Sequence, residues 1–561
     1  MRLSPKSAED SSGLLLNLVI SKLWRHGWTV LVGAIALLIS VPVLFVLSSL
    51  ATPAGEIWQH LAQTVLLRYV LNSLGLMLGV GCGVVLLGVA GAWLVTMCQF
   101  PGRRVMEWAL LLPLAAPAYI LAYAYTEVLE FYGPVQTGLR AVFGWQGLQD
   151  YWFPPIRSLG GAIALLTLVL YPYVYLLVRV AFLEQSVCTL EASRSLGCTP
   201  WRSFWRVALP LARPAIAAGT ALALMETLSD FGTVQFFGVD TFTTGIYRTW
   251  FGMGERPAAS QLAALLLLFV LALVWAEQWF RRQSRYFQTH SRQQIARYHL
   301  LGWRGALALL VCLIPVLLGF VIPLALLLQL TINDLGQLAN PEFWTFARNS
   351  LLLAAITAGL GVAIALVMAY GARLNPSMGM TLATRIAAMG YAIPGSVIAV
   401  GVLVPIGGLD NAIDAAMRNR FGIATGLLFS GTIIALVFAY LVRFLAVAFN
   451  TLESSLGRIK PSLDDASRSL GHSTLATLRR VHIPLLGSSL LTAALLVFVD
   501  VIKELPATLI IRPFNFDTLA VRVYQLAADE RLAAAAAPAL AIVAVGILPV
   551  LLLSRQIRRS P

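Results

Sequence analysis

Charged residues are scarce in this chain. Asp, Glu, Lys and Arg make up 12% of its 561 residues, whereas hydrophobic residues make up 58%. A soluble chain of this length would need charged surfaces around several hydrophobic cores, so the composition excludes a soluble protein. Long apolar runs recur throughout the sequence, which indicates an integral membrane protein of many spans.

Cysteine and histidine are also rare. The five cysteines are odd in number, scattered and never arranged as CxxC, so they predict neither a disulfide framework nor a thiolate metal site. The six histidines lack the spacing of metal ligands. We therefore expect no metal site in this chain.

Lysine is rarer still, and its placement excludes one large class of enzyme. The only lysines are Lys6, Lys22, Lys460 and Lys503, and none follows a glycine. A P-loop needs Gly-Lys followed by Ser or Thr, so the chain has no such site for hydrolysing ATP. It also lacks HExxH and GxSxG motifs, so we expect no catalytic residues and no cofactor of its own.

Apolar stretches long enough to cross a membrane number about twelve, which predicts an all-α fold. They lie near residues 28–50, 70–97, 106–130, 158–182, 211–229, 258–280, 304–330, 349–371, 382–407, 426–449, 485–503 and 532–554. The predicted organisation is an N-terminal segment, a six-span half, a linker, a second six-span half and a tail, at residues 1–27, 28–280, 281–303, 304–554 and 555–561.

The basic residues predict the orientation of these spans. With the N-terminus in the cytoplasm, the cytoplasmic segments hold 25 Lys and Arg against 11 in the outer loops. The basic residues behind the net charge of +14 are thus distributed over many loops and do not form one patch with stacking aromatic residues. This distribution argues against nucleic acid as a partner. The arginines of the linker predict contact with lipid headgroups. Both termini are expected in the cytoplasm.

The chain contains an internal repeat. The run Ala-Ser-Arg-Ser-Leu-Gly occurs at residues 192–197 and again at 466–471, 274 residues later. Asn72 matches Asn349 and Pro117 matches Pro394, both at a spacing of 277. Because each half holds an even number of spans, the halves are predicted to be parallel repeats with a substrate path between them.

The pattern of each copy of the repeated motif predicts a helix, a glycine and a second helix. Gly197 and Gly471 supply positions where the chain can turn without a Cβ penalty. A single copy could be a helix that only caps a loop. Two copies with identical residues in an exposed loop, normally the most variable part of a repeat, indicate that both meet the same surface. This predicts two copies of one partner.

These segments, EASRSLGCTPWRSFWRVALP and DASRSLGHSTLATLRRVHIP, resemble the EAA loops of permeases in binding-protein-dependent ABC importers. The second copy departs from the pattern by having Asp in place of Glu. The resemblance implies coupling helices seated in two cytoplasmic ATP-binding subunits, which would bind ATP and Mg, and a periplasmic solute-binding protein as a further partner in a bacterial inner membrane. The residues implied in coupling are Glu191, Ala192, Arg194, Gly197, Arg206, Pro210, Asp465, Ala466, Arg468, Gly471, Arg480 and Pro484.

Two further segments are similar to ferric-iron permeases. They begin at Asp230 and at Asp500, after the fifth and eleventh spans, and are expected to face the periplasm. The resemblance implies ferric iron as the transported solute. Permeases for thiamine, phosphonates or polyamines share the architecture and remain alternatives.

Four carboxylates near these segments suggest an outer vestibule. Glu226 and Asp230 correspond to Asp500 and Glu504 at a spacing of 274, and a separation of four places each pair on one helix face. A buried carboxylate costs at least a few kcal/mol and tends to face a cavity, and hard oxygen ligands suit a trivalent cation. The alternative is that these residues are helix ends reaching water, with Lys503 neutralising its neighbours.

A competing interpretation is a secondary transporter driven by an ion gradient. Such carriers also contain repeats and intramembrane carboxylates, but they give no reason for the duplicated cytoplasmic helices. Co-purification of an ATPase would separate the two classes.

Overall fold

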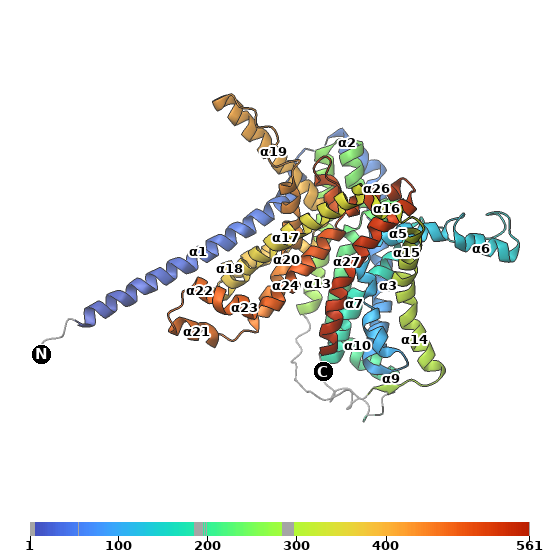
Figure 1. Cartoon of the computed structure of the whole chain (residues 1–561), viewed down its shortest axis with the longest axis horizontal. Coiled ribbons are helices and arrows are strands. Elements are labelled where there is room, and N and C mark those ends of the chain that lie inside the picture. Colours follow the sequence, from blue (N-terminus) through green and yellow to red (C-terminus); the bar gives the residue numbers. More distant parts are fainter. Residues whose placement is uncertain are drawn as a thin grey trace. The chain divides into compact units, whose positions relative to one another are not determined.

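The computed structural model describes residues 6–53, 55–184, 195, 197, 199–282 and 297–559. Nearly all of these residues are helical (Figure 1). The chain forms two compact units, each assembled from separate stretches of sequence. Unit 1 comprises Met1–Phe45, Leu353–Tyr391 and Val437–Val501, and unit 2 comprises Val46–Leu352, Ala392–Leu436 and Ile502–Pro561.

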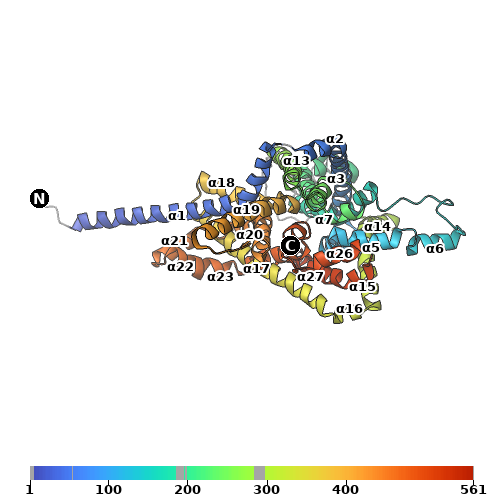
Figure 2. The ribbon, with the colours of Figure 1, turned by 90° about the horizontal axis from the view of Figure 1, so that it is seen from above.

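Unit 2 is built around a bundle of long apolar helices. Close approach of small residues explains their packing, since a Cβ on Gly88 would lie 2.9 Å from the backbone nitrogen of Tyr175, and one on Gly219 would lie 2.7 Å from the Cα of Val174. Helices α3 and α7 accordingly lie side by side in Figures 1 and 2. The principal helices are α2 (Glu56–Thr64), α3 (Leu66–Met97), α7 (Leu159–Glu184), α10 (Leu209–Ser229), α13 (Arg256–Arg282), α14 (Trp303–Val316), α15 (Ile322–Asn333) and α27 (Leu532–Arg559).

In unit 1, helix α1 (Lys6–Ser48) packs against the end of α17 (Pro341–Leu374). The rings of Trp28 and Tyr370 meet edge to face at 5.7 Å, and the Asn375 amide donates a hydrogen bond of 2.9 Å to Thr29. The remaining helices of this unit are α18 (Met378–Ala387), α20 (Ile433–Gly457), α21 (Ser462–Ser469), α22 (Thr474–Thr477), α23 (Ile483–Leu485) and α24 (Gly487–Lys503).

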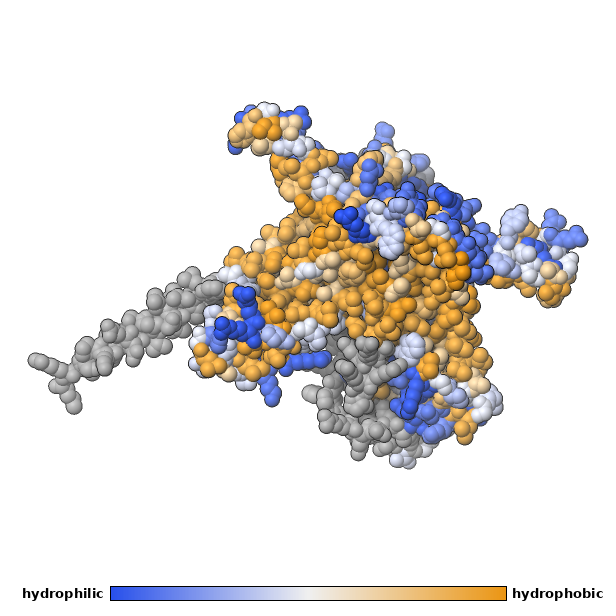
Figure 3. All heavy atoms as spheres, viewed as in Figure 1, coloured by the Kyte–Doolittle hydropathy of each residue, from blue (hydrophilic) through white to orange (hydrophobic). Residues whose placement is uncertain are grey.

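The expectation of about twelve membrane-spanning helices is confirmed. Among the described residues, ten helices are long and apolar enough to cross a membrane, or up to twelve if each of two bent pairs is one span. Hydrophobic residues cover the exposed surface over α15 and α27, and hydrophilic residues gather beyond its edges (Figure 3). Such a surface suits the hydrocarbon core of a bilayer.

The bends themselves were not predicted. The stretch expected at 106–130 is the pair Arg103–Ala115 and Ala118–Phe143, bent by 93°, and the stretch expected at 485–503 is the pair Thr474–Leu485 and Gly487–Lys503, bent by 77°. The stretch expected at 382–407 also differs, because Pro394 caps a new helix, α19 (Gly395–Phe421), that starts after a break. Proline disfavours helical geometry in the residue before it, which explains this break.

The same local structures recur at the spacings found in the sequence. At a spacing of 274, α9 (Pro200–Ser203) corresponds to α22, and the π-helical turn at Phe204–Ala208 corresponds to that at Leu478–His482. A hydrogen bond recurs at a spacing of 277: the Asn72 amide donates to the carbonyl of Asp240 at 2.8 Å, and the Asn349 amide donates to the carbonyl of Asp517 at 3.0 Å. Both carbonyls precede a short helix, α12 (Phe242–Tyr247) or α26 (Leu519–Ala528). The sequence repeat is thus accompanied by repeated local geometry.

The one pair of strands in the described part of the chain joins the end of α3 to the end of the linker. Strand β1 (Cys98–Gln99) pairs in parallel with β2 (Tyr298–His299). The Arg297 side chain donates to the Thr96 carbonyl at 3.3 Å, and Trp93 packs against Tyr298 with ring centres 6.4 Å apart. The linker therefore returns to the bundle at the end of α3.

Candidate functional site

The second copy of the motif (residues 458–484, the second loop) contains a helix, a glycine and another helix. Helix α21 ends at Ser469, Gly471 adopts a left-handed conformation with φ of 78°, and α22 follows. The Ser473 hydroxyl caps α22 by accepting a hydrogen bond from the backbone nitrogen of Ala476 at 3.3 Å. Glycine adopts a left-handed φ at no steric cost, which explains why the turn occurs there.

An ionic network anchors the second loop to α17. The Arg373 guanidinium donates to the Asp464 carboxylate at 2.6 and 2.9 Å, to the Leu456 carbonyl at 2.7 Å and to the Ile459 carbonyl at 3.0 Å. His482 is fully buried, and its Nε2 lies 2.6 Å from the other oxygen of Asp464. Arg373 and Asp464 are 16% and 23% exposed, so their attraction is only partly screened by water.

Two neutral hydrogen bonds lie beside this ionic network. The Tyr370 hydroxyl, one turn before Arg373, donates to the Thr474 carbonyl at 2.9 Å. Inside the loop, the hydroxyls of Ser467 and Thr477 pair at 2.8 Å in a buried position. We name Arg373, Asp464 and His482 the ionic anchor.

The opposite face of the second loop is exposed. The side chains of Asp465 and Arg468 pair at 2.5 Å while each stays 66% exposed, and Ala466 and Gly471 are exposed as well. Leu470 is 76% exposed. Arg480 contacts His472 at 3.0 Å, and Pro484 lies in the first turn of α23. The motif residues therefore present a mixed polar and apolar surface away from the ionic anchor.

The first copy (residues 185–210, the first loop) is described only in part. Glu191, Ala192 and Arg194 lie outside the described residues. Gly197 has a φ of 80°, like its counterpart Gly471, while Arg206 is exposed and Pro210 lies in the first turn of α10.

In the described part of the first loop, an aromatic contact joins the loop to α3. The ring of Phe204 packs against Trp93 at 4.8 Å, and Trp93 also contacts Tyr298 from the linker. The positions that match Arg373 and His482 hold Thr96 and Ala208, which cannot form an ionic anchor.

Two of the four carboxylates suggested for an outer vestibule, Asp230 and Glu504, cap helices at matching positions of the two halves. Asp230 accepts hydrogen bonds from the Thr233 hydroxyl at 2.9 Å and the backbone nitrogen of Val234 at 3.1 Å, at the start of α11 (Gly232–Phe236). Glu504, only 4% exposed, accepts from the backbone nitrogens of Ala507 at 2.8 Å and Thr508 at 3.0 Å, at the start of α25 (Pro506–Ile511). Negative charge stabilises a helix N-terminus, so these two residues have a structural role.

The other two carboxylates are half-buried. Glu226 lies on α10 in unit 2, and Asp500 lies on α24 in unit 1. Lys503 donates to the Leu114 carbonyl at 2.7 Å. Within the described residues, no group of three or more His, Cys, Asp or Glu could hold a metal ion. The vestibule stays a prediction.

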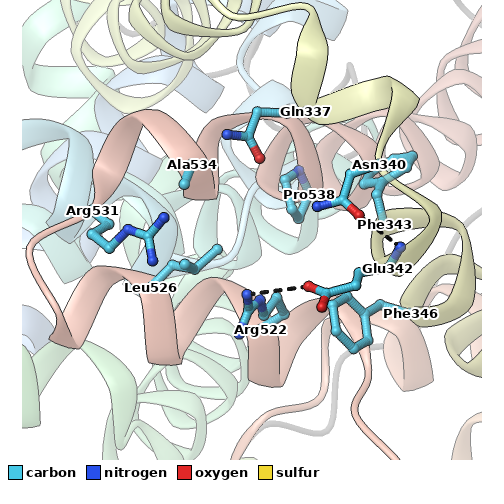
Figure 4. A pocket seen from close by; sticks show the side chains of 10 residues that line it. All are labelled: Gln337, Asn340, Glu342, Phe343, Phe346, Arg522, Leu526, Arg531, Ala534 and Pro538. Atoms are coloured by element: carbon cyan, nitrogen blue, oxygen red, sulfur yellow. Dashed lines mark hydrogen bonds and ion pairs between the residues drawn. The ribbon is translucent and has the colours of Figure 1, made fainter.

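A cationic pocket of about 220 Å³ lies in unit 2 between the start of α17 and the α26–α27 connection (Figure 4). Arg522 pairs with Glu342 at 3.6 Å and lies over the ring of Phe346 at 5.4 Å. Arg531, an exposed residue, contributes a second guanidinium beside Leu526. No sequence pattern marks these side chains, because the pocket joins segments about 180 residues apart, as Glu342 and Arg522 are.

Comparison with known proteins places these features in a family. Residues 75–286 match the model of the binding-protein-dependent transport system inner membrane component. The chain is 26% identical to the Fe(3+)-transport system permease protein FbpB 2 of Haemophilus influenzae, over 94% of this chain and 97% of that protein. It is 30% identical to the sulfate transport system permease protein CysT of Synechococcus elongatus, over 45% of this chain and 88% of that protein.

Among solved structures, the chain is similar to a bacterial alginate ABC transporter in complex with an alginate pentasaccharide-bound periplasmic protein. The two are 13% identical in sequence, with a TM-score of 0.34, and the match covers 46% of this chain and 96% of the transporter chain. The family match and the likeness to the sulfate permease across most of its length agree with the apolar helices described above. The chain belongs to the family of inner membrane components of binding-protein-dependent transport systems, which are the permease subunits of ABC transporters.

Proposed function

We propose that this chain is the fused permease of an ABC importer that carries ferric iron from a periplasmic binding protein into the cytoplasm. The observation that carries the proposal is the match to an Fe(3+)-transport permease along 94% of the chain, which includes both halves. A sulfate permease matches less than half of the chain, as expected if each half corresponds to one permease unit.

The two loops are the proposed attachment sites for two copies of a cytoplasmic ATP-binding subunit. The recurrence of the helix, the left-handed glycine and the π-helical turn at a spacing of 274 supports this proposal. Two loops that share these features can enter two identical clefts. The partner subunits would bind ATP and Mg, and this chain would supply no catalytic group.

The orientation follows from the distribution of charge. With both termini in the cytoplasm, both loops lie on the cytoplasmic side, and the α26–α27 connection with its cationic pocket lies on the periplasmic side. ATP binding would draw the two partner subunits together, and each loop would move with its partner. The ionic anchor would transfer that motion to α17, and the two halves would rock to switch access from outside to inside.

Reconstitution tests this proposal. The chain, purified with the ATPase that co-purifies with it, is placed in vesicles with the binding protein, radioactive ferric iron and ATP. We expect uptake that requires both ATP and the binding protein. Uptake without any ATPase would point instead to a secondary transporter. ATP-driven uptake of thiamine, a phosphonate or a polyamine, with none of iron, would assign one of those alternatives.

A further inference from the structure

A second cavity, of about 500 Å³, lies in unit 1 beside the second loop. One wall is the segment from the end of α20 to the start of α21, and the other is the junction of α23 and α24. The lining residues are Ser455, Arg458, Ile459, Lys460, Ser462, Leu463, Leu485, Leu486 and Ser489.

The polar part of this lining is cationic. Arg458 and Lys460 are both exposed, and neither side chain forms a hydrogen bond or an ion pair with any other described residue. The cavity contains no carboxylate to neutralise them. The hydroxyls of Ser462 and Ser489 add donors for a bound oxyanion, whereas the Ser455 hydroxyl already donates to the Thr451 carbonyl at 2.8 Å. Two uncompensated cations beside hydroxyl groups suit a phosphate group.

The apolar part of the lining places the cavity at a membrane surface. Leu485 and Leu463 are 56% and 42% exposed. Ser489 belongs to the first turn of α24, and α24 is the longer arm of the bent pair that qualifies as a span. Leu491, two residues further along α24, is 71% exposed, as expected for a side chain that meets lipid. The cavity therefore begins where the polar loop ends and the apolar span starts.

We propose that this cavity binds the headgroup of an anionic phospholipid. Arg458 and Lys460 contact the phosphate, the hydroxyls of Ser462 and Ser489 donate hydrogen bonds to its oxygens, and the exposed leucines contact the upper acyl chain. That the lipid comes from the cytoplasmic leaflet rests on the orientation given under the proposed function. Clusters of basic residues next to a span attract anionic lipids of that leaflet.

Such a lipid would also stabilise the second loop. The carbonyl of Ile459, a lining residue, accepts a hydrogen bond from Arg373 of the ionic anchor. A headgroup held by residues 458 and 460 on either side of that carbonyl would restrict this segment in its docked position. The first loop has no counterpart of Arg373, so the lipid effect should be confined to the second loop.

The test measures lipid binding to the purified full chain, without an ATPase, by native mass spectrometry and by titration with phosphatidylglycerol or phosphatidylcholine. We expect phosphatidylglycerol to bind preferentially. The double variant Arg458→Gln with Lys460→Gln should weaken its binding roughly 30-fold, since each charge near the surface contributes about a five-fold effect. Arg458→Lys with Lys460→Arg, which keeps both charges, should retain most of the affinity.

The matched control is Arg385→Gln with Arg420→Gln, which removes two exposed arginines outside the cavity and leaves the same net charge. We expect this control to bind phosphatidylglycerol like the unmodified chain. Equal losses in both double variants, or no preference for the anionic lipid, would overturn the proposal. Displacement of the lipid by millimolar inorganic phosphate would indicate a site for the free anion. Weakened ATPase binding with unchanged lipid binding would instead make the cavity a protein contact. Because no step involves transport, these outcomes are independent of which solute is carried.

Discussion

Replacing Arg373 with alanine should release the second loop from α17. The substitution removes four hydrogen bonds, two of them to a carboxylate, and leaves Asp464 beside His482 without its main cation. Breaking a buried ion pair costs about 3–5 kcal/mol, and a hydrogen bond to a charged group contributes about 1.5–3 kcal/mol. Because the two side chains are 16% and 23% exposed, we take the lower end, about 3 kcal/mol. That corresponds to a shift of roughly 100-fold between docked and released loop.

Hydrogen exchange and coupled transport measure this change together. In Arg373→Ala we expect amides around residues 456–472 to exchange faster, while ATP hydrolysis by the attached subunits continues with less iron carried per ATP. In Arg373→Lys, amide exchange and iron carried per ATP should lie between those of the unmodified chain and of Arg373→Ala. A lysine keeps the charge, but its ammonium group cannot reproduce the forked contacts of a guanidinium. A double-mutant cycle with Asp464→Ala should give an interaction energy of about 1–3 kcal/mol.

The control is Arg468→Ala, which removes an equally short contact with Asp465 on the exposed face. Exposed ion pairs contribute about 0–1 kcal/mol, so this variant should leave exchange within the loop nearly unchanged. Its effect should instead fall on binding of the ATPase. Unaltered exchange and unaltered transport in Arg373→Ala would refute the role of the ionic anchor.

Four further substitutions test other parts of the structure. Gly197→Val and Gly471→Val should each destabilise its loop by roughly 1–2 kcal/mol and reduce ATP-driven uptake. A left-handed φ of 80° or 78° disfavours a branched side chain, although no atom of the described residues lies within 4 Å of the added Cβ. Asn at either position should retain more uptake than Val, and equal loss would contradict the backbone explanation. Gly546→Ala should lower the melting temperature in detergent, since its Cβ would lie 2.0 Å from the Ala115 carbonyl oxygen. Glu504→Gln should weaken the cap of α25 by about 1–3 kcal/mol, which the same melting assay detects; unchanged melting would remove its capping role.

The spans were predictable because apolar length leaves a direct trace in the sequence. The expected stretch 70–97, for example, lies within helix Leu66–Met97. The bends were harder to predict, because they depend on where short helices end and how neighbouring elements pack. Pro117 and Pro394 matched in the sequence comparison, but only the structure shows that each caps a helix after a break.

The ionic anchor could not be found by the comparison that found the loops. That comparison selects residues that are the same in both halves, whereas the anchor consists of residues present in one half alone. Arg373 and Asp464 are also 91 residues apart, and a single ion pair between distant elements leaves no periodic pattern. The cavity beside the second loop was not predicted either. Its walls come from the two ends of the loop, which only the folded structure brings together.

Fusion of the two halves explains how such a difference can exist. A permease made of two identical chains must present identical loops, whereas a fused chain can change one loop without the other. Here the motif keeps the same six residues and the same left-handed glycine in both halves, as binding to two identical partners would require. The side that faces the permease has diverged, with Arg373, Asp464 and His482 under one loop and Trp93 with Phe204 under the other. Ionic contacts weaken with salt, whereas aromatic packing depends little on it. Under the proposed function, the ionic anchor should therefore make the coupling of the second loop to α17 sensitive to ionic strength.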